Sequence, residues 1–440
     1  MSQQEIVPAS EDVAALAHAF GISTEYRDQS GQQRIVPAST VAAVLEAFGV
    51  DVSSEAGKAA AWDRVTNDPW RRLVPHTVVA AEDAHRAVLV HLPHGASVDV
   101  WLELELGGRV PLTQMEHLAE PRTIDGTLMG EAAFVVQQDV PLGWHELHAK
   151  TSTGAAQHGV YVVTPAVLGL PESMREGRHW GVMAQLYATR SAQSWGFGDL
   201  HDLGSLAAWA GERGGDFVLV NPMHAAEPKG RIEPSPYLPS TRRYFSPLYI
   251  RVEDIAEYAM LTSDARDAIA AAAAPLQALS ASADLIDRDP IWAAKRAALE
   301  VVFAQPMSSA RQSAFDLYVA EQGAGLVQFA RWCAFAEEYG TASQLWPEGL
   351  RHPQGPAIAQ EATRLDALVQ FHLRCQWVLD EQFAAAQDRA KAAGMASGIV
   401  HDLAVGVHPD GADSWALQDV MAKTMNVGAP PDMYNQLGQD

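Results

Sequence analysis

Two segments of the sequence bring together carboxylates, aromatic side chains and stiff backbone. The first, PSPYLPSTRRYFSPLYI from Pro234 to Ile250, holds four prolines, three serines and three tyrosines, and we call it the proline loop. Because proline fixes φ and lacks an amide donor, we expect a rigid irregular loop here. Such a loop loses little entropy on binding, and Tyr237 offers an apolar face and a hydroxyl that suit a sugar ring. The alternative is a structural loop with buried tyrosines.

The second segment is HPDGADSW, from His408 to Trp415, which places Asp410 and Asp413 shortly after Asp402. Carboxylates in this position suit sugar hydroxyls, a metal ion or acid–base chemistry. We expect Asp413 to be a solvated surface residue.

Two further motifs could carry chemistry, and we assign each a structural role. GFGDL, from Gly196 to Leu200, lacks the third glycine and the later acid of a dinucleotide site, so we expect a tight turn before a helix capped by Asp199. HELH, from His145 to His148, lies in an alternating pattern that puts the two histidines on opposite faces of a strand. The helical H-E-x-x-H spacing is absent, so we expect no metal site and no cluster of ligands there.

The elements that must position the two segments are three short apolar runs. GVMAQLYAT (181–189), DFVLVNPMHA (216–225) and GIVHDLAVGV (398–407) each indicate a buried strand, and a Gly-terminated helix separates the first two. This βαβ order predicts a parallel sheet, with an almost entirely helical insertion at about 255–394. Since functional loops follow the carboxyl ends of parallel strands, we expect the proline loop and the His408–Trp415 segment to meet at one edge.

The residues before this sheet indicate two smaller domains. An approximate repeat, starting at Val7 and Val36, predicts a hairpin of two helices with N-caps at Ser10 and Ser39 and glycine stops. Period-two alternation from about residue 76 to 165 predicts an antiparallel β-sandwich. We therefore expect domains at 1–70, 71–168 and 169–440.

Composition restricts the class of protein. The 440 residues carry a formal charge of −23 and no clustered basic stripe, which argues against a nucleic-acid partner. No apolar run is long enough to span a membrane, and the start of the chain does not resemble a signal peptide. The two cysteines, Cys333 and Cys375, lie in helical patterns and are expected to be buried and unpaired. A cytoplasmic location fits these observations.

Five consecutive motifs resemble those of the amylomaltases, the 4-α-glucanotransferases of the α-amylase clan. They are RHWGVMAQLYATRSAQSWGFGDLHDL, DFVLVNPMHA, SPYLPSTRRYFSPLYI, HDLAVGVHPDGADSW and VGAPPDMYNQLGQD, in that order between Arg178 and Asp440. The resemblance implies an α/β fold, the first part of a (β/α)₈ TIM barrel. It also implies transfer of α-1,4-glucan segments between maltodextrins by a retaining double displacement, without metal or organic cofactor.

The resemblance also assigns binding residues. Ser235, Pro236 and Tyr237 would line the subsite around the bond to be cut, and Asp410 would bind a sugar on the donor side. Asp432 and Tyr434, in the GAPPD motif, would close over the acceptor. The implied substrates are maltose, maltodextrins and amylose.

The sequence departs from the family pattern in two ways. Met433 replaces an aromatic residue common in the family. The R-I-D-H segment with the family's nucleophile, and the later acids, do not occur before residue 440, so we expect the catalytic carboxylates beyond it and no catalytic residue in this chain. The chain alone is expected to be inactive and to need the missing C-terminal half of the barrel. Two alternatives stay open: a non-catalytic glucan-binding or scaffold module, and a hydrolase of the same clan.

Overall fold

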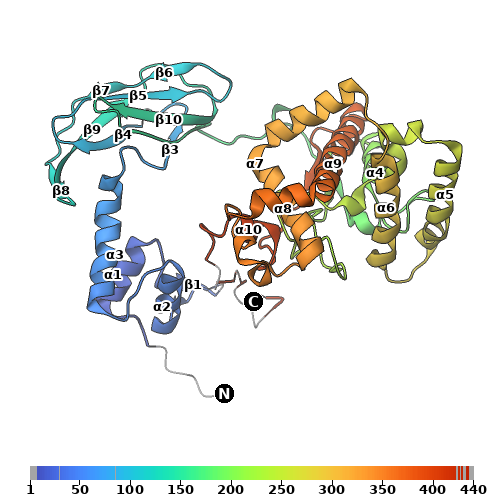
Figure 1. Cartoon of the computed structure of the whole chain (residues 1–440), viewed down its shortest axis with the longest axis horizontal. Coiled ribbons are helices and arrows are strands. Elements are labelled where there is room, and N and C mark those ends of the chain that lie inside the picture. Colours follow the sequence, from blue (N-terminus) through green and yellow to red (C-terminus); the bar gives the residue numbers. More distant parts are fainter. Residues whose placement is uncertain are drawn as a thin grey trace. The chain divides into compact units, whose positions relative to one another are not determined.

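The computed structural model divides into two compact units, the first formed by residues 1–170 and 429–439 and the second by residues 171–428 and 440. Figure 1 shows the elements of each unit along the chain. The description covers residues 7–28, 30–84, 86–422, 425–426, 428–429 and 433–435. None of the helices in these ranges is both long and apolar enough to cross a lipid bilayer. The three-domain division predicted above stays a prediction.

The first unit begins with three helices, α1 (Glu11–Ala19), α2 (Ala38–Ala47) and α3 (Glu55–Asn67), and a hairpin of β1 (Glu25–Arg27) and β2 (Gln33–Ile35). Gly21 and Gly49 follow α1 and α2 with φ of 75° and 71°, a left-handed conformation that stops a helix. The prediction of an N-cap at Ser39 is wrong, because α2 already starts at Ala38 and the preceding residue is Pro37. Ser10 does occupy the N-cap of α1, without a side-chain cap hydrogen bond.

A β-sandwich completes the first unit. One sheet has the order β3-β11-β10-β5-β6, and the other β4-β9-β7 with β8 paired to β9. The prediction of a wholly antiparallel domain is wrong at one place, since β3 and β11 are parallel. The buried side chains between the sheets include Val90, Leu102 and Leu147. The strands are β3 (Thr77–Ala81), β4 (Val88–Pro93), β5 (Val98–Glu103), β6 (Arg109–Pro111), β7 (Thr113–Met115), β8 (Arg122–Ile124), β9 (Thr127–Val135), β10 (Gly143–Thr151) and β11 (Ala156–Thr164).

A three-stranded parallel sheet lies at the centre of the second unit. Its order is β12 (Gly181–Ala184), β13 (Phe217–Val220) and β14 (Gly398–His401), and α4 (Leu200–Gly211) connects the first two strands. The parallel βαβ arrangement is therefore confirmed. The strands are shorter than predicted, and two are not buried, with Met183 74% and Val400 39% exposed. β12 and β14 flank β13, so each pairs on one side only among the described residues.

The helical insertion between β13 and β14 is confirmed. It contains α5 (Ser263–Ala278), α6 (Arg288–Phe303), α7 (Ser309–Tyr339), α8 (Ile358–Arg364) and α9 (Asp366–Ala392), and α10 (Ala412–Ala416) follows β14. In Figure 1, α9 runs beside α7 and α4. Cys333 and Cys375 are buried and unpaired, as expected. Short 3₁₀ turns are η1 (Asp68–Arg71), η2 (Glu172–Met174), η3 (Leu186–Ala188), η4 (Pro247–Tyr249), η5 (Val252–Asp254), η6 (Ala256–Met260), η7 (Leu279–Ala281), η8 (Ser343–Leu345) and η9 (Glu348–Leu350).

A buried ion network holds the start of α4. Asp199 and Asp202 form the capping box of this helix. Arg251, directly after the proline loop, donates from Nε to Asp199 Oδ2 at 2.5 Å and from Nη2 to Asp202 Oδ1 at 3.3 Å. The predicted cap at Asp199 is thus confirmed, and it also anchors the loop that follows β13.

Candidate functional site at the strand ends

The proline loop leaves the carboxyl end of β13 and has no strand and only the η4 turn, as predicted. Its middle is tied to the segment after β13, because Ser240 N donates to Ala225 O at 2.9 Å and Ala225 N donates to Tyr244 O at 3.0 Å. Tyr244 and Tyr249 are buried, whereas Tyr237 is 53% exposed. Both interpretations of the loop therefore hold, for different tyrosines, and only Tyr237 is free to contact a ligand.

Asp413 fastens the proline loop to the segment after β14. Its carboxylate is buried and accepts hydrogen bonds from Thr241 Oγ1 at 2.9 Å, Arg242 N at 2.8 Å and Arg243 Nε at 2.9 Å. The prediction of a solvated Asp413 is wrong. The loop crosses over the start of α10, and a carboxylate is the one acceptor there that satisfies three donors at once.

Tyr237 meets the end of β14 through Asp402. The Tyr237 hydroxyl donates to Asp402 Oδ2 at 3.4 Å, and Asp402 N extends the sheet ladder to Val220 O at 3.2 Å. Partial burial and the Asp402 charge raise the pKa of the Tyr237 phenol above its ordinary value. A neutral hydroxyl and a carboxylate are thus presented together, a pair that can donate to and accept from sugar hydroxyls.

Ser235 and Pro236 precede Tyr237 and line a small hollow under the proline loop. Tyr187 and His224 contribute other parts of its wall. Ser235 is exposed, and its Oγ accepts from Tyr237 N at 3.4 Å. This contact orients the serine beside the tyrosine.

Asp410 lines a separate and larger cavity of about 690 Å³. Arg242 from the proline loop and Gln344 from the helical insertion also line it. The backbone joins this cavity to the proline loop, since His408 N donates to Pro239 O at 2.7 Å. The segments that carry Tyr237 and Asp410 therefore meet, as predicted, although Tyr237 is not part of the lining of the cavity beside Asp410.

The other two predicted binding residues are Asp432 and Tyr434. Asp432 lies outside the described residues. Tyr434 is 91% exposed and groups with the first compact unit. Their roles stay predictions.

His224 is a residue that sequence reasoning missed. It lies four residues after the last residue of β13 and stacks on Phe245 with ring centroids 6.2 Å apart. Its Nε2 accepts a hydrogen bond from Ala404 N at 3.5 Å. Burial lowers the pKa of its imidazole below the ordinary value. The sequence signal that could have identified it is its position in the motif DFVLVNPMHA, close to the end of a predicted strand.

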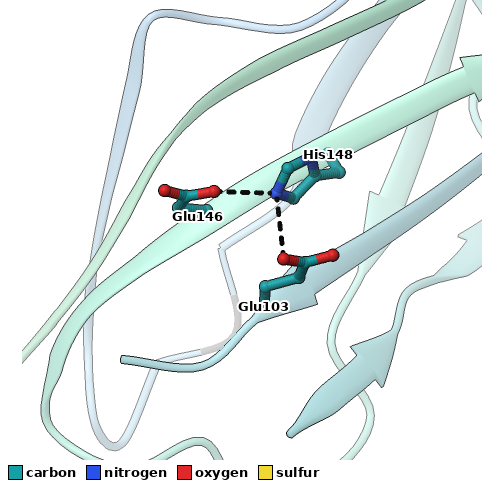
Figure 2. A group of neighbouring side chains, drawn as sticks. All are labelled: Glu103, Glu146 and His148. Carbon is teal, nitrogen blue, oxygen red and sulfur yellow. Dashed lines mark hydrogen bonds and ion pairs between the residues drawn. The ribbon is translucent and has the colours of Figure 1, made fainter. Parts of the chain in front are cut away.

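The HELH motif does form part of a cluster, contrary to prediction. Figure 2 shows Glu146 and His148 on β10 facing Glu103 on β5. His148 Nε2 lies 3.1 Å from Glu146 Oε2 and 3.7 Å from Glu103 Oε2, and the three ligand atoms lie within 4.8 Å of one another. His145 points to the opposite, buried face, as expected. Glu103 and Glu146 are exposed and His148 is partly buried, and the imidazole lies between the two carboxylates.

Two known families match this chain. Residues 73–165 match the MalQ N-terminal beta sandwich domain. Residues 184–440, more than half of the chain, match the 4-alpha-glucanotransferase family. The chain belongs to the 4-alpha-glucanotransferase family. The resemblance to the amylomaltases is thereby confirmed.

Individual 4-alpha-glucanotransferases agree with this assignment. The enzyme of Mycobacterium tuberculosis is 45% identical over 444 residues, which is 99% of this chain and 60% of the relative. That of Haemophilus influenzae is 29% identical over 321 residues, 68% of this chain and 45% of the relative. The crystal structure of amylomaltase from Corynebacterium glutamicum has a TM-score of 0.86 and 41% identity, covering 98% of this chain and 60% of that one. The chain thus spans at most 60% of these relatives.

Proposed function

We propose that this protein is a 4-α-glucanotransferase that transfers α-1,4-glucan segments between maltodextrins by a retaining double displacement. One observation carries the proposal. The exposed Tyr237 and the carboxylate of Asp402 lie 3.4 Å apart where the proline loop meets the end of β14. An aromatic face beside hydrogen-bonding groups is the combination that binds a sugar ring.

We assign the subsite around the scissile bond to Ser235, Pro236 and Tyr237, and a donor-side sugar contact to Asp410. Asp432 and Tyr434 are assigned to the acceptor side. No residue of this chain is assigned as nucleophile or general acid. The parallel strands β12, β13 and β14 are proposed to be strands of a (β/α)₈ barrel, whose ligand sites lie at the carboxyl ends.

Transfer requires that a sugar hydroxyl attacks the glycosyl intermediate in place of water. A rigid loop that shields the site favours the sugar, because water is then excluded. The network around Asp413 and Arg251 supplies that rigidity. We place the protein in the cytoplasm, since its two cysteines are buried and unpaired.

The test uses maltotriose as the only substrate, with product sizes resolved by chromatography. The test is run on the 440-residue chain and on the longest protein that the same gene encodes. We expect the longer product to form glucose together with maltodextrins longer than maltotriose. We expect the 440-residue chain to bind maltoheptaose without transferring it. Hydrolysis without lengthened products would contradict the proposal and favour a hydrolase, and binding without any catalysis by either protein would favour a scaffold module.

A further inference from the structure

A third pocket lies in the first unit, far along the chain from the strand ends. It has a volume of about 450 Å³ and lies between the helical segment and the β-sandwich. The apolar part of its lining comes from Ala19, Phe20, Val65, Pro69 and Pro75. The polar part of its lining contains two arginines, Arg64 and Arg72, and two histidines, His76 and His91. It contains one carboxylate, that of Asp68.

The two arginines of this pocket have no carboxylate partner among the described residues. Arg64 Nη1 donates to Phe48 O at 3.0 Å, and Arg72 Nε donates to Val74 O at 3.3 Å. These contacts orient the guanidinium groups and leave their other N–H donors for a ligand. The neighbouring Arg71 behaves differently, because it pairs with three aspartates.

The single carboxylate of the lining pairs with Arg71, which it shares with Asp63 and Asp125. Asp68 Oδ1 accepts from Arg71 Nη1 at 2.8 Å. His91 is likewise engaged, with Nε2 2.7 Å from Glu131 Oε2 and its ring stacked on Trp70 at 4.4 Å. In the part of the chain that the structure describes, Arg64 and Arg72 are the charged side chains of the lining that have no ion-pair partner, in a chain whose formal charge is −23.

The pocket wall is held in place from both sides. Arg71 in η1 bonds Asp125, in the turn between β8 and β9, through Nε at 2.8 Å and Nη2 at 3.0 Å. His91 N on β4 donates to Leu73 O at 3.1 Å. A site that is ordered before binding loses little entropy when a ligand enters.

We propose that this pocket binds an organic phosphate monoester. Two guanidinium groups from different elements match the several oxygens and the double charge of a phosphate better than the two oxygens of a carboxylate. The apolar side chains around Phe20 would contact the organic part of the ligand. The volume accommodates a phosphate with one or two rings, and the site is independent of the glucan site.

Calorimetric titration and thermal unfolding of the whole 440-residue chain test the proposal. The probes are AMP, adenosine and inorganic phosphate. We expect AMP to raise Tm through binding to the folded state. Adenosine and inorganic phosphate are each expected to bind at least about 10-fold more weakly than AMP, because each lacks one half of the recognised ligand.

The variants Arg64→Gln and Arg72→Gln should each weaken AMP binding at least about 10-fold. Arg109→Gln is the matched control, since Arg109 is an exposed sandwich arginine stacked on Trp101 and should bind AMP like the wild type. The Tm measured without ligand reports whether each variant folds. Because Arg64 is exposed, Arg64→Gln should lower Tm less than Arg72→Gln does. The proposal is overturned if ~10 mM AMP leaves Tm unchanged, if adenosine or phosphate binds as well as AMP, or if the folded Arg64→Gln variant keeps wild-type affinity.

Discussion

The buried carboxylate of Asp413 accepts a hydrogen bond from the Thr241 hydroxyl at 2.9 Å, across a sequence separation of 172 residues. The same carboxylate accepts hydrogen bonds from the Arg242 backbone amide and the Arg243 guanidinium group. This one side chain therefore joins the proline loop to the segment after β14, and with it the two halves of the proposed glucan site.

Replacing Asp413 by alanine should reduce the free energy of unfolding by about 3 kcal/mol, because three donors lose their acceptor and one of them is charged. Urea denaturation of the chain measures this loss. Asp419→Ala is the control, since Asp419 has 73% side-chain exposure and pairs only with a histidine. A loss for Asp413→Ala no larger than that of the control would show that the network does not hold the loop.

Tyr237→Ala should weaken maltoheptaose binding about 10-fold, in line with the loss of one aromatic contact and one hydrogen bond. Because the side chain is 53% exposed, the unfolding free energy should barely change. Tyr237→Phe keeps the ring and should recover most of the affinity. Affinity gel electrophoresis with amylose measures both variants, and unchanged mobility of Tyr237→Ala would exclude this residue from the site.

Asp199→Asn should destabilise the second unit by about 3–5 kcal/mol, because it leaves the buried Arg251 charge without its main partner. The measurement is thermal or urea unfolding followed by circular dichroism. Asp254→Asn tests an exposed ion pair with His201, and its effect should stay below about 1 kcal/mol. Equal effects of the two substitutions would contradict the importance of the buried network.

Lys295 should make stability depend on pH. Its Nζ donates to Leu248 O at 2.5 Å and to Ile250 O at 2.8 Å, and burial lowers its pKa from 10.5 to about 8. Between about pH 8 and pH 10.5, Lys295 stays protonated in the unfolded chain and loses its proton in the folded chain. The unfolded chain therefore binds more protons, and the free energy of unfolding rises with pH. The unfolding free energy of the wild type relative to Lys295→Met should increase by about 2 kcal/mol from pH 8 to pH 10.

The buried phenol of Tyr249 acts in the opposite direction at higher pH, since burial raises its pKa to about 12. Tyrosine in the unfolded chain ionises around its ordinary pKa of 10.0. The wild type and Lys295→Met both keep Tyr249, so its contribution cancels in the difference between their unfolding free energies. If the difference in unfolding free energy between the wild type and Lys295→Met stayed constant from pH 8 to pH 10, Lys295 would have the same pKa in the folded and unfolded chains, and the prediction would be wrong.

Gly198→Ala should disrupt the turn before α4. A Cβ at this position would lie 2.0 Å from Leu186 O and 2.2 Å from Thr189 O, both of them backbone atoms. The clash can be relieved only by moving the strand-end loop, so we expect a loss of about 3 kcal/mol in unfolding free energy. Gly169→Ala, which meets nothing within 4 Å, is the control and should be neutral.

Local features of the molecule followed directly from residue types. The prolines of the proline loop disfavour α-helix and strand interiors, and Gly21 and Gly49 stop their helices because glycine adopts positive φ at little cost. The parallel order of β12 and β13 and the cap at Asp199 also followed from sequence patterns, since the periodicity and the helix signals are local.

The burial or exposure of individual polar and aromatic side chains depended on long-range contacts, which local sequence patterns do not reveal. Asp413 is buried, and Tyr237 is exposed while Tyr249 is not, because segments more than 150 residues apart cross at the end of β14. Glu103 joins Glu146 and His148 only through the register between β5 and β10. Sequence by itself determined which chemistry the chain carries, and the tertiary structure decided which groups meet, since burial and pairing are set by long-range packing.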